Sequence, residues 1–238
     1  MLQALVFDMD GTLADTEDAH LAAFNRAFAD EGLDWHWTRE AYLELLRISG
    51  GKERMLHYWH SREPELRELE PGARQALVDR LHDTKTSYYE AAVQAGEVRW
   101  RPGVLALMDE AQRAGLALGI ATTTSPANVA ALLRSALGSE WRRSFGAVAD
   151  AGNAPLKKPH PQAYNRALAD LGVVAAKALA FEDSANGLQA ASAAGLATVI
   201  TPNAYTAHHD FSGALRVLPD LGGVRLAHLR EWLSCATV

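Results

Sequence analysis

Short apolar segments alternate with helical patterns along the second half of this chain. Apolar runs at residues 116–121, 147–149, 178–181 and 197–201 are separated by segments with helical spacing. Such alternation is typical of parallel strands joined by right-handed helical crossovers. Residues 5–7 add an apolar strand near the start of the chain. The sequence therefore predicts an α/β fold with a doubly wound, Rossmann-like parallel sheet.

A helical block interrupts this pattern after the first strand. Residues 16–96 show helical spacing without a strand pattern, and we expect helices over residues 18–31, 39–48, 52–62 and from 71 or 72 to about 95. A charged connector with one proline fills residues 63–70. We therefore predict a core domain of residues 1–15 and 97–238, and an all-helical cap domain of residues 16–96. The hinges are expected at residues 15–16 and 98–101.

Composition narrows the class of protein. Apolar residues make up 48% of the chain and charged residues 22%, which is typical of a globular protein with a full core. The net charge of −6 argues against a nucleic-acid partner, and no apolar stretch is long enough to span a membrane. The single cysteine, Cys235, has no intrachain partner for a disulfide. We expect a cytoplasmic monomer that binds a small molecule, placed in the plastid stroma only if a transit peptide has been removed.

Polar side chains follow three of the expected strands. Asp8 and Asp10 follow the first strand, and Glu182 and Asp183 follow a later one. A run of hydroxyl residues, 122–125, follows the strand between them. The carboxyl ends of parallel strands meet at one edge of a sheet, where four carboxylates would repel each other without a cation. Mg²⁺ suits such a set because it prefers oxygen ligands and leaves room for a phosphate. A surface turn would explain the first pair alone, but not the three strand ends together.

These motifs together resemble the haloacid dehalogenase-like (HAD) phosphohydrolase superfamily. The resemblance rests on Asp8-Met9-Asp10-Gly11-Thr12-Leu13, Thr122, Lys158-Pro159 and Glu182-Asp183-Ser184, in that order along the chain. The helical insertion resembles the cap of the β-phosphoglucomutase and phosphoglycolate phosphatase branch. Residues 35–54, which include Gly50-Gly51-Lys52-Glu53-Arg54, and residues 121–125 also resemble the CbbY-type members. That group includes phosphatases acting on xylulose 1,5-bisphosphate, an inhibitor of Rubisco.

The resemblance implies catalytic roles for four residues. Asp8 would be the nucleophile that forms an aspartyl-phosphate, and Asp10 would act as general acid and base. Thr122 would donate a hydrogen bond to the phosphoryl group, and Lys158 would supply a positive charge. Position alone does not separate Lys158 from the adjacent Lys157. Lys158 is chosen because the lysine of the family directly precedes a proline.

The resemblance also implies a metal site and a substrate site. Mg²⁺ would be held by Asp8, the backbone carbonyl of Asp10 and Asp183, with Glu182 contributing directly or through water. Gly50-Gly51 followed by Lys52 and Arg54 could bind a second phosphate, although a solvated turn is the alternative. The candidate substrate-binding residues are Glu17, His20, Tyr42, Gly50, Gly51, Lys52, Arg54, Thr122, Thr123, Thr124, Ser125 and Lys158.

We expect a Mg²⁺-dependent phosphatase of a small phosphosugar, with xylulose 1,5-bisphosphate as the specific candidate. A sugar phosphomutase would use the same core residues and differ only in its product. A phosphonatase with Lys52 as a Schiff base is disfavoured by Asp10, whose acid/base chemistry suits ester cleavage. A dehalogenase would need no metal cluster. A scaffold that only binds a phosphorylated ligand would be expected to lack a catalytic group, and none is missing.

Overall fold

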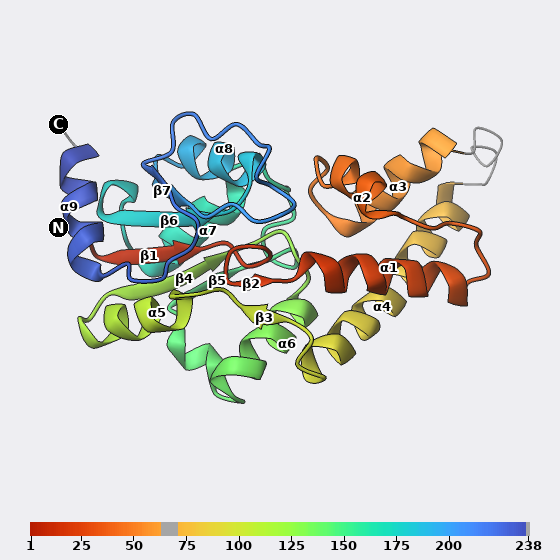
Figure 1. Cartoon of the computed structure of the whole chain (residues 1–238), viewed down its shortest axis with the longest axis horizontal. Coiled ribbons are helices and arrows are strands. Elements are labelled where there is room, and N and C mark those ends of the chain that lie inside the picture. Colours follow the sequence, from red (N-terminus) through yellow and green to blue (C-terminus); the bar gives the residue numbers. More distant parts are fainter. Residues whose placement is uncertain (63–70, 237–238) are drawn as a thin grey trace. The chain divides into compact units, whose positions relative to one another are not determined.

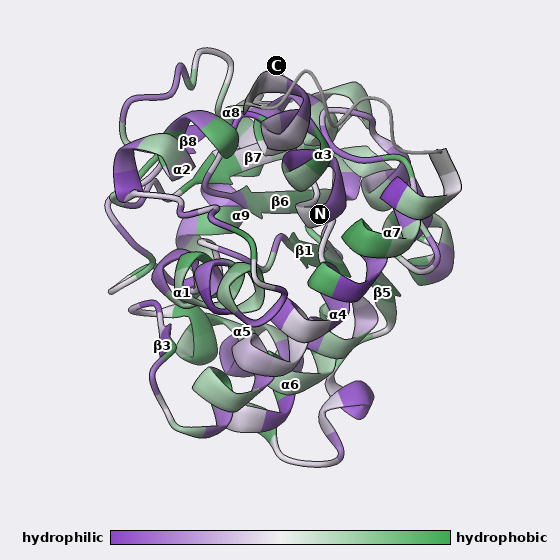
Figure 2. Ribbon diagram, turned by 90° about the vertical axis from the view of Figure 1, so that its right-hand side faces the viewer, coloured by the Kyte–Doolittle hydropathy of each residue, from purple (hydrophilic) through white to green (hydrophobic). Residues whose placement is uncertain are grey.

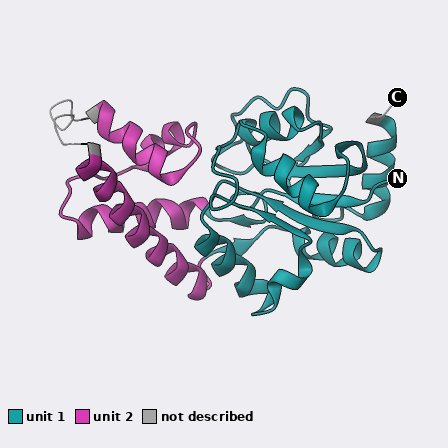
Figure 3. Cartoon of the chain, turned by 180° about the vertical axis from the view of Figure 1, so that it is seen from behind, with its two compact units in different colours: residues 1–16, 98–238 teal, residues 17–97 magenta. Residues whose placement is uncertain are grey.

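The computed structural model describes residues 1–62 and 71–236. The chain divides into two compact units, one of residues 1–16 with 98–238 and one of residues 17–97 (Figure 3). We call them the α/β unit and the helical unit. Their boundaries differ by one residue from those expected from the sequence. The expected connector at residues 63–70 lies outside the described residues.

The α/β unit contains a six-stranded parallel sheet in the order β5-β4-β1-β6-β7-β8 (Figure 1). Its strands are β1 (Ala4–Phe7), β4 (Ala117–Ala121), β5 (Ala147–Ala149), β6 (Ala178–Glu182), β7 (Ala197–Ile200) and β8 (Arg216–Val217). Phe7 is in register with Ile120 on one side and Phe181 on the other, so β1, β4 and β6 end at the same level. The chain runs outward from β1 in both directions. Such a switch in strand order is where α/β sheets bind their ligands.

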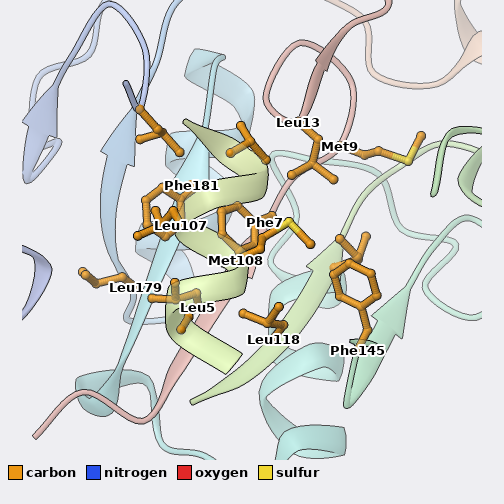
Figure 4. Close-up of a cluster of buried hydrophobic side chains, with 14 of the residues drawn as sticks. Leu5, Phe7, Met9, Leu13, Leu107, Met108, Leu118, Phe145, Leu179 and Phe181 are labelled. Carbon is orange, nitrogen blue, oxygen red and sulfur yellow. The ribbon is translucent and has the colours of Figure 1, made fainter. Parts of the chain in front are cut away.

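One face of the sheet carries large apolar side chains. Leu5 and Phe7 of β1 pack with Leu107 and Met108 of α5 in a single buried cluster (Figure 4). Three helices contribute to this cluster: α5 (Val104–Arg113), α6 (Pro126–Leu137) and α9 (Leu226–Ala236). Because side chains alternate along a strand, the intervening residues point to the other face.

The other face is built mainly from alanine. Ala4, Ala178 and Ala180 pack there against Ala163 and Ala167. The covering helices are α7 (Gln162–Leu171) and α8 (Ala185–Ala193). Small side chains on both partners let helix and sheet approach closely. Both faces of β6 are therefore covered by apolar groups, and the strand is apolar up to its last residue, Glu182 (Figure 2).

Local signals fix where the helices begin and end. Ser125 accepts a hydrogen bond from the backbone N–H of Asn128 at the start of α6, and Pro126 is the first helical residue. Ser184 similarly accepts from Gly187 N at the start of α8. Both helices therefore begin with a hydroxyl cap, and α6 also has proline as its first residue. Two short 3₁₀ helices, Trp141–Ser144 and Ala175–Lys177, complete the unit.

Three two-residue strands were not expected. β2 (Ala14–Asp15) and β3 (Arg99–Trp100) form an antiparallel pair on the two chain segments that lead into and out of the helical unit. These are the segments expected to act as hinges. β8 extends the main sheet at its edge. Two residues are too short for an alternating pattern to be recognised in a sequence.

The helical unit contains α1 (Glu17–Asp30), α2 (Arg39–Leu45), α3 (Gly51–Arg62) and α4 (Pro71–Gln94). Its core is largely aromatic, and the buried rings include Phe24, Phe28, Trp35, Trp37, Tyr42 and Trp59. Thr38 caps α2, and its side chain accepts a hydrogen bond from the backbone N–H of Ala41. Among the described residues, no helix combines the length and apolar composition needed to cross a bilayer.

The helix expected over residues 39–48 is shorter than predicted. α2 ends at Leu45, and Ile48 N donates back to Leu45 O in a tight turn. Gly50 follows with φ of 100°, a left-handed conformation that ends the turn, whereas Gly51 already belongs to α3. The break is therefore at Gly50 alone, and the side chain of Arg54 bonds the carbonyls left at the end of α2.

Candidate active site

A buried lysine lies between two carboxylates at the carboxyl edge of the sheet. Lys158 Nζ lies 2.5 Å from Asp8 Oδ1 and 2.5 Å from Glu182 Oε1. Asp8 directly follows β1, Glu182 ends β6, and Lys158 precedes α7. All three side chains are at least nine-tenths buried. The sheet therefore brings together three of the motifs that are distant in the sequence.

The charges of this cluster depend on one another. Burial alone disfavours the charged lysine, but the adjacent charges of Asp8 and Glu182 outweigh it and raise the pKa of Lys158 above its ordinary value. Burial raises the pKa of the Asp8 carboxyl to about 7, opposed by Lys158 and reinforced by Glu182. A metal ion bound at Asp8 would lower this pKa and favour the ionised carboxylate.

Glu182 is held by several donors at once. Its Oε1 accepts from Tyr164 Oη at 2.6 Å in addition to Lys158. Its Oε2 accepts from the Asp183 N–H and the Ser184 hydroxyl. Gly187 lies so close that a Cβ there would collide with the carboxylate. These contacts fix Glu182 as the partner of Lys158.

Asp183 completes an acidic group with Asp8 and Glu182. One carboxylate oxygen from each lies within 4.8 Å of the others, and all three residues are buried. Asn203 Nδ2 donates to Asp183 Oδ2 at 2.7 Å. Hard carboxylate oxygens gathered at this spacing suit Mg²⁺, so the residues present fit the expected ion.

The turn after β1 holds Asp10 beside this group. Asp10 pairs with Ala14 in an isolated bridge, and its charge contributes to the raised pKa of Asp8. Gly11 has φ of 76°, which favours glycine, and the Thr12 hydroxyl donates to Asp8 Oδ2 at 3.3 Å. The sequence Asp-Gly-Thr thus makes a tight turn that returns a hydroxyl to the first carboxylate.

Of the hydroxyl residues after β4, Thr122 continues the pairing with β5, whereas Thr124 and Ser125 contact the start of α6. Thr122 is buried, and its N–H donates to Ala149 O, which extends the strand pairing. Thr124 and Ser125 bond Asn128 at the start of α6. Thr123 O accepts from Lys157 Nζ at 3.2 Å. The structure therefore places Lys158 in the acidic cluster and Lys157 on a backbone carbonyl.

Three candidate residues of the helical unit form a hydrogen-bonded chain. Tyr42 Oη donates to Glu17 Oε2 at 2.7 Å and accepts from Arg54 Nη1 at 3.2 Å. Arg54 also donates to Leu45 O at 3.0 Å and Ile48 O at 3.2 Å. Arg54 is 9% exposed, so its guanidinium largely serves the end of α2.

The other candidates of the helical unit have different surroundings. Lys52 is half-buried and pairs with Asp79 at 2.6 Å. His20 is buried, stacks on Tyr89 and lies 2.8 Å from Lys85 Nζ. Gly50 and Gly51 supply the turn into α3.

Three residues that contact the acidic cluster or the turn after β1 were not expected as site residues: Tyr164, Arg101 and Asn203. Lys85, which contacts His20 in the helical unit, was not expected either. Tyr164 is fully buried, and its position in the stripe Ala163, Tyr164, Ala167 marks it as core. Arg101 and Asn203 bond backbone carbonyls far away in the sequence, which no spacing rule detects. Arg101 is buried and Asn203 is half-buried, and neither lies in a motif that marks it as a site residue.

Comparisons with known proteins agree with this geometry. The family model described as haloacid dehalogenase-like hydrolase matches residues 2–195. Protein CbbY (plasmid) from Cupriavidus necator is 52% identical over 93% of this chain and 86% of that protein. The crystal structure of CbbY from Rhodobacter sphaeroides in complex with phosphate has a TM-score of 0.87 and 42% identity, covering 97% of this chain and 100% of that one.

A mutant of that Rhodobacter sphaeroides protein has also been crystallised, in complex with xylulose 1,5-bisphosphate. It matches with a TM-score of 0.87 and 42% identity over 96% of this chain and 99% of that chain. The family match spans all four acidic residues, the hydroxyl run and the buried lysine. The chain therefore belongs to the haloacid dehalogenase-like hydrolases.

Proposed function

We propose that this chain is a Mg²⁺-dependent phosphatase that removes phosphate from xylulose 1,5-bisphosphate. The observation that carries the reaction class is the buried Lys158 held between Asp8 and Glu182 beside Asp183. The substrate is proposed because a relative of 42% identity, covering nearly the whole chain, was solved with that sugar.

Asp8 is the proposed nucleophile. Its carboxylate attacks phosphorus, the P–O bond to the sugar breaks, and an aspartyl-phosphate forms. Asp10 gives a proton to the departing sugar oxygen and then takes one from the water that hydrolyses the intermediate. Lys158 holds Asp8 in place and supplies positive charge where the phosphoryl oxygens gather.

Thr122 is the proposed hydrogen-bond donor to the phosphoryl group. It is buried directly after β4, one position beyond the residue that is level with Asp8 on the adjacent strand. The N–H groups at the start of α6 also lie at this edge and favour an anion. Thr123, Thr124 and Ser125 are proposed to shape this end of the site.

Asp8, the backbone carbonyl of Asp10 and Asp183 are the proposed Mg²⁺ ligands. Bound there, Mg²⁺ would neutralise charge between nucleophile and phosphate. Both oxygens of Glu182 accept hydrogen bonds from the protein. We therefore assign Glu182 to the water-mediated role.

The helical unit is proposed to recognise the second phosphate and the sugar. Lys52 is the favoured cation because its side chain is about 40% exposed. Arg54 is the weaker candidate because three of its nitrogens already donate within the unit. Glu17, His20, Tyr42, Gly50 and Gly51 are proposed to shape this part of the site.

A phosphate-release assay over sugar mono- and bisphosphates tests the proposal. We expect xylulose 1,5-bisphosphate to give the highest kcat/KM, with activity lost in EDTA and restored by Mg²⁺. Asp8→Asn should fold but lose turnover by about a thousandfold or more. An isomeric sugar phosphate as the product, without free phosphate, would identify a mutase instead. Equal rates across the panel would contradict the substrate assignment.

A further inference from the structure

The carbonyl of Gly11 accepts hydrogen bonds from two side chains outside the motifs. Arg101 Nη1 donates to it, and Asn203 Nδ2 lies 3.4 Å away. Arg101 follows β3, and Asn203 lies in the loop after β7, so the contacts bridge 90 and 192 positions in the sequence. Gly11 itself stands between Asp10 and Thr12. Two donors therefore fix the turn that carries the proposed acid/base.

Asn203 also contacts the proposed metal ligand of the other strand. The same Nδ2 that faces Gly11 O donates to Asp183 Oδ2 at 2.7 Å. A Cβ on Gly11 would collide with both of these side chains. The turn, the amide and the carboxylate are thus in direct contact. Movement of any one of them would displace the others.

Arg101 holds the loop that presents Asn203. Its guanidinium donates to the carbonyls of Thr201 and Pro202, the two residues before Asn203. It also donates to Pro219 O at 3.1 Å, and its own N–H donates to Leu13 O at 2.9 Å. A planar guanidinium can satisfy several carbonyls in fixed directions, which an ammonium cannot do.

The loop has its own turn, which is separate from these contacts. Asn203 Oδ1 accepts from Tyr205 N at 2.8 Å, and Asn203 N donates to Thr206 Oγ1 at 3.1 Å. The oxygen of the amide therefore shapes the loop, while the nitrogen faces Gly11 and Asp183. A variant of Asn203 can therefore remove the contacts with Gly11 and Asp183 while keeping the hydrogen bond that shapes the loop.

We propose that Arg101 and Asn203 form a clamp, the Gly11 clamp, that positions Asp10 and the carboxylate of Asp183 for Mg²⁺. The inference rests on the proposed function, because it assigns both residues to the support of that metal site. Groups that orient metal ligands typically change metal affinity by about 10- to 100-fold when they are removed. Both are positioning residues, since they act through Gly11 and Asp183.

Two variants separate positioning from folding. Arg101→Lys keeps the charge but cannot reach four carbonyls together. Asn203→Ser keeps a short side-chain oxygen for the turn at Tyr205 but is too short to donate to Asp183. Asn153→Ala is the matched control. Asn153 lies in the loop after β5, accepts from Asp150 N at 3.0 Å and donates to Val148 O at 2.8 Å.

The measurement is calorimetric titration of Mg²⁺ into the phosphate-free protein, with Tm in EDTA measured alongside. We expect Mg²⁺ affinity to fall by about tenfold in each clamp variant and to change by less than about twofold in Asn153→Ala. Steady-state assays in saturating Mg²⁺ should show a lower kcat with little change in KM.

The outcomes separate this inference from the proposed function. Wild-type Mg²⁺ affinity in Asn203→Ser overturns the clamp even if Arg101→Lys fails to fold. A lower Tm without a change in Mg²⁺ affinity in both variants does the same, because it assigns them a structural role alone. If the wild-type protein binds no Mg²⁺, the proposed metal site fails and the clamp fails with it.

Discussion

Two buried cations, Lys158 in the α/β unit and Arg54 in the helical unit, are surrounded in opposite ways. Lys158 faces the carboxylates of Asp8 and Glu182. Arg54 faces the carbonyls of Leu45 and Ile48 and a tyrosine hydroxyl. Both are at least nine-tenths buried. Burial of a cation therefore does not by itself indicate a catalytic role. The groups that the cation contacts are the better indicator.

The two cations differ because carbonyl groups and carboxylates have different requirements when they are buried. Carbonyls at the end of a helix require donors, and a guanidinium satisfies several at once without reacting. Buried carboxylates around a lysine are expensive to desolvate, and a hydrophobic replacement would often be as stable. The comparison therefore supports the proposed catalytic role of Lys158, and it indicates that Arg54 mainly serves the end of α2.

Removal of Lys158 should give the largest effect. In Lys158→Met, we expect kcat/KM to fall by about 10²- to 10³-fold, because the positive charge at the phosphoryl site is lost. Steady-state phosphate release in saturating Mg²⁺ measures this. Lys157→Met is the matched control, since Lys157 donates only to Thr123 O among the contacts described for it. A larger loss in Lys157→Met than in Lys158→Met would reverse the assignment.

Much of the fold could be predicted because its signals are local. Strand and helix patterns, the Ser125-Pro126 start of α6 and the glycine ends of helices are all visible within a few residues. The acidic cluster followed from one further step, because parallel strands must end at a common edge. The two-residue strands β2, β3 and β8 carry no such pattern and exist only through pairing with distant segments.

Site residues could be predicted only where a strand end or a motif in the sequence marks their position. Lys158 was chosen over Lys157 from the family pattern, and in the structure Lys158 contacts Asp8 whereas Lys157 donates to Thr123 O. Tyr164, Arg101 and Asn203 were missed because their roles depend on groups that fold next to them. Arg54 looked like a free cation at a helix start, since the sequence does not show that α2 ends early.

Removal of Arg54 should mainly affect stability. Arg54→Ala takes away charged donors from Leu45 O, Ile48 O and Tyr42. We expect the free energy of unfolding to fall by about 2–4 kcal/mol, measured by urea or thermal denaturation. KM measured at a temperature where the variant is folded should rise by less than in Lys52→Ala. Unchanged stability together with a lost bisphosphate affinity would instead make Arg54 the phosphate ligand.

The cluster around Lys158 should also make stability depend on pH. The pKa of Asp8 is raised from 3.8 to about 7 without a metal ion. The folded state therefore binds this proton more tightly than the unfolded state. The resulting stabilisation is complete below about pH 4 and is lost as pH rises through about 7. We expect the free energy of unfolding of the wild type, relative to Asp8→Asn, to fall by about 2 kcal/mol between about pH 5 and 8 in EDTA.

Mg²⁺ provides the internal control for that measurement. A bound cation favours the ionised carboxylate, so the pH dependence assigned to Asp8 should shrink when Mg²⁺ is present. A constant difference between wild type and Asp8→Asn over this pH range in EDTA would contradict the raised pKa.

Lys52 should give the smallest change in stability and the most selective change in binding. Its ion pair with Asp79 involves side chains that are 40% and 43% exposed, and such pairs contribute about 0–1 kcal/mol. Lys52→Ala should therefore leave Tm nearly unchanged but raise KM for xylulose 1,5-bisphosphate by about tenfold, with KM for an aryl phosphate unaffected. Asp79→Asn removes the partner and leaves the lysine charge, so it should not raise KM for the bisphosphate. If both substrates respond equally to Lys52→Ala, Lys52 does not bind the second phosphate.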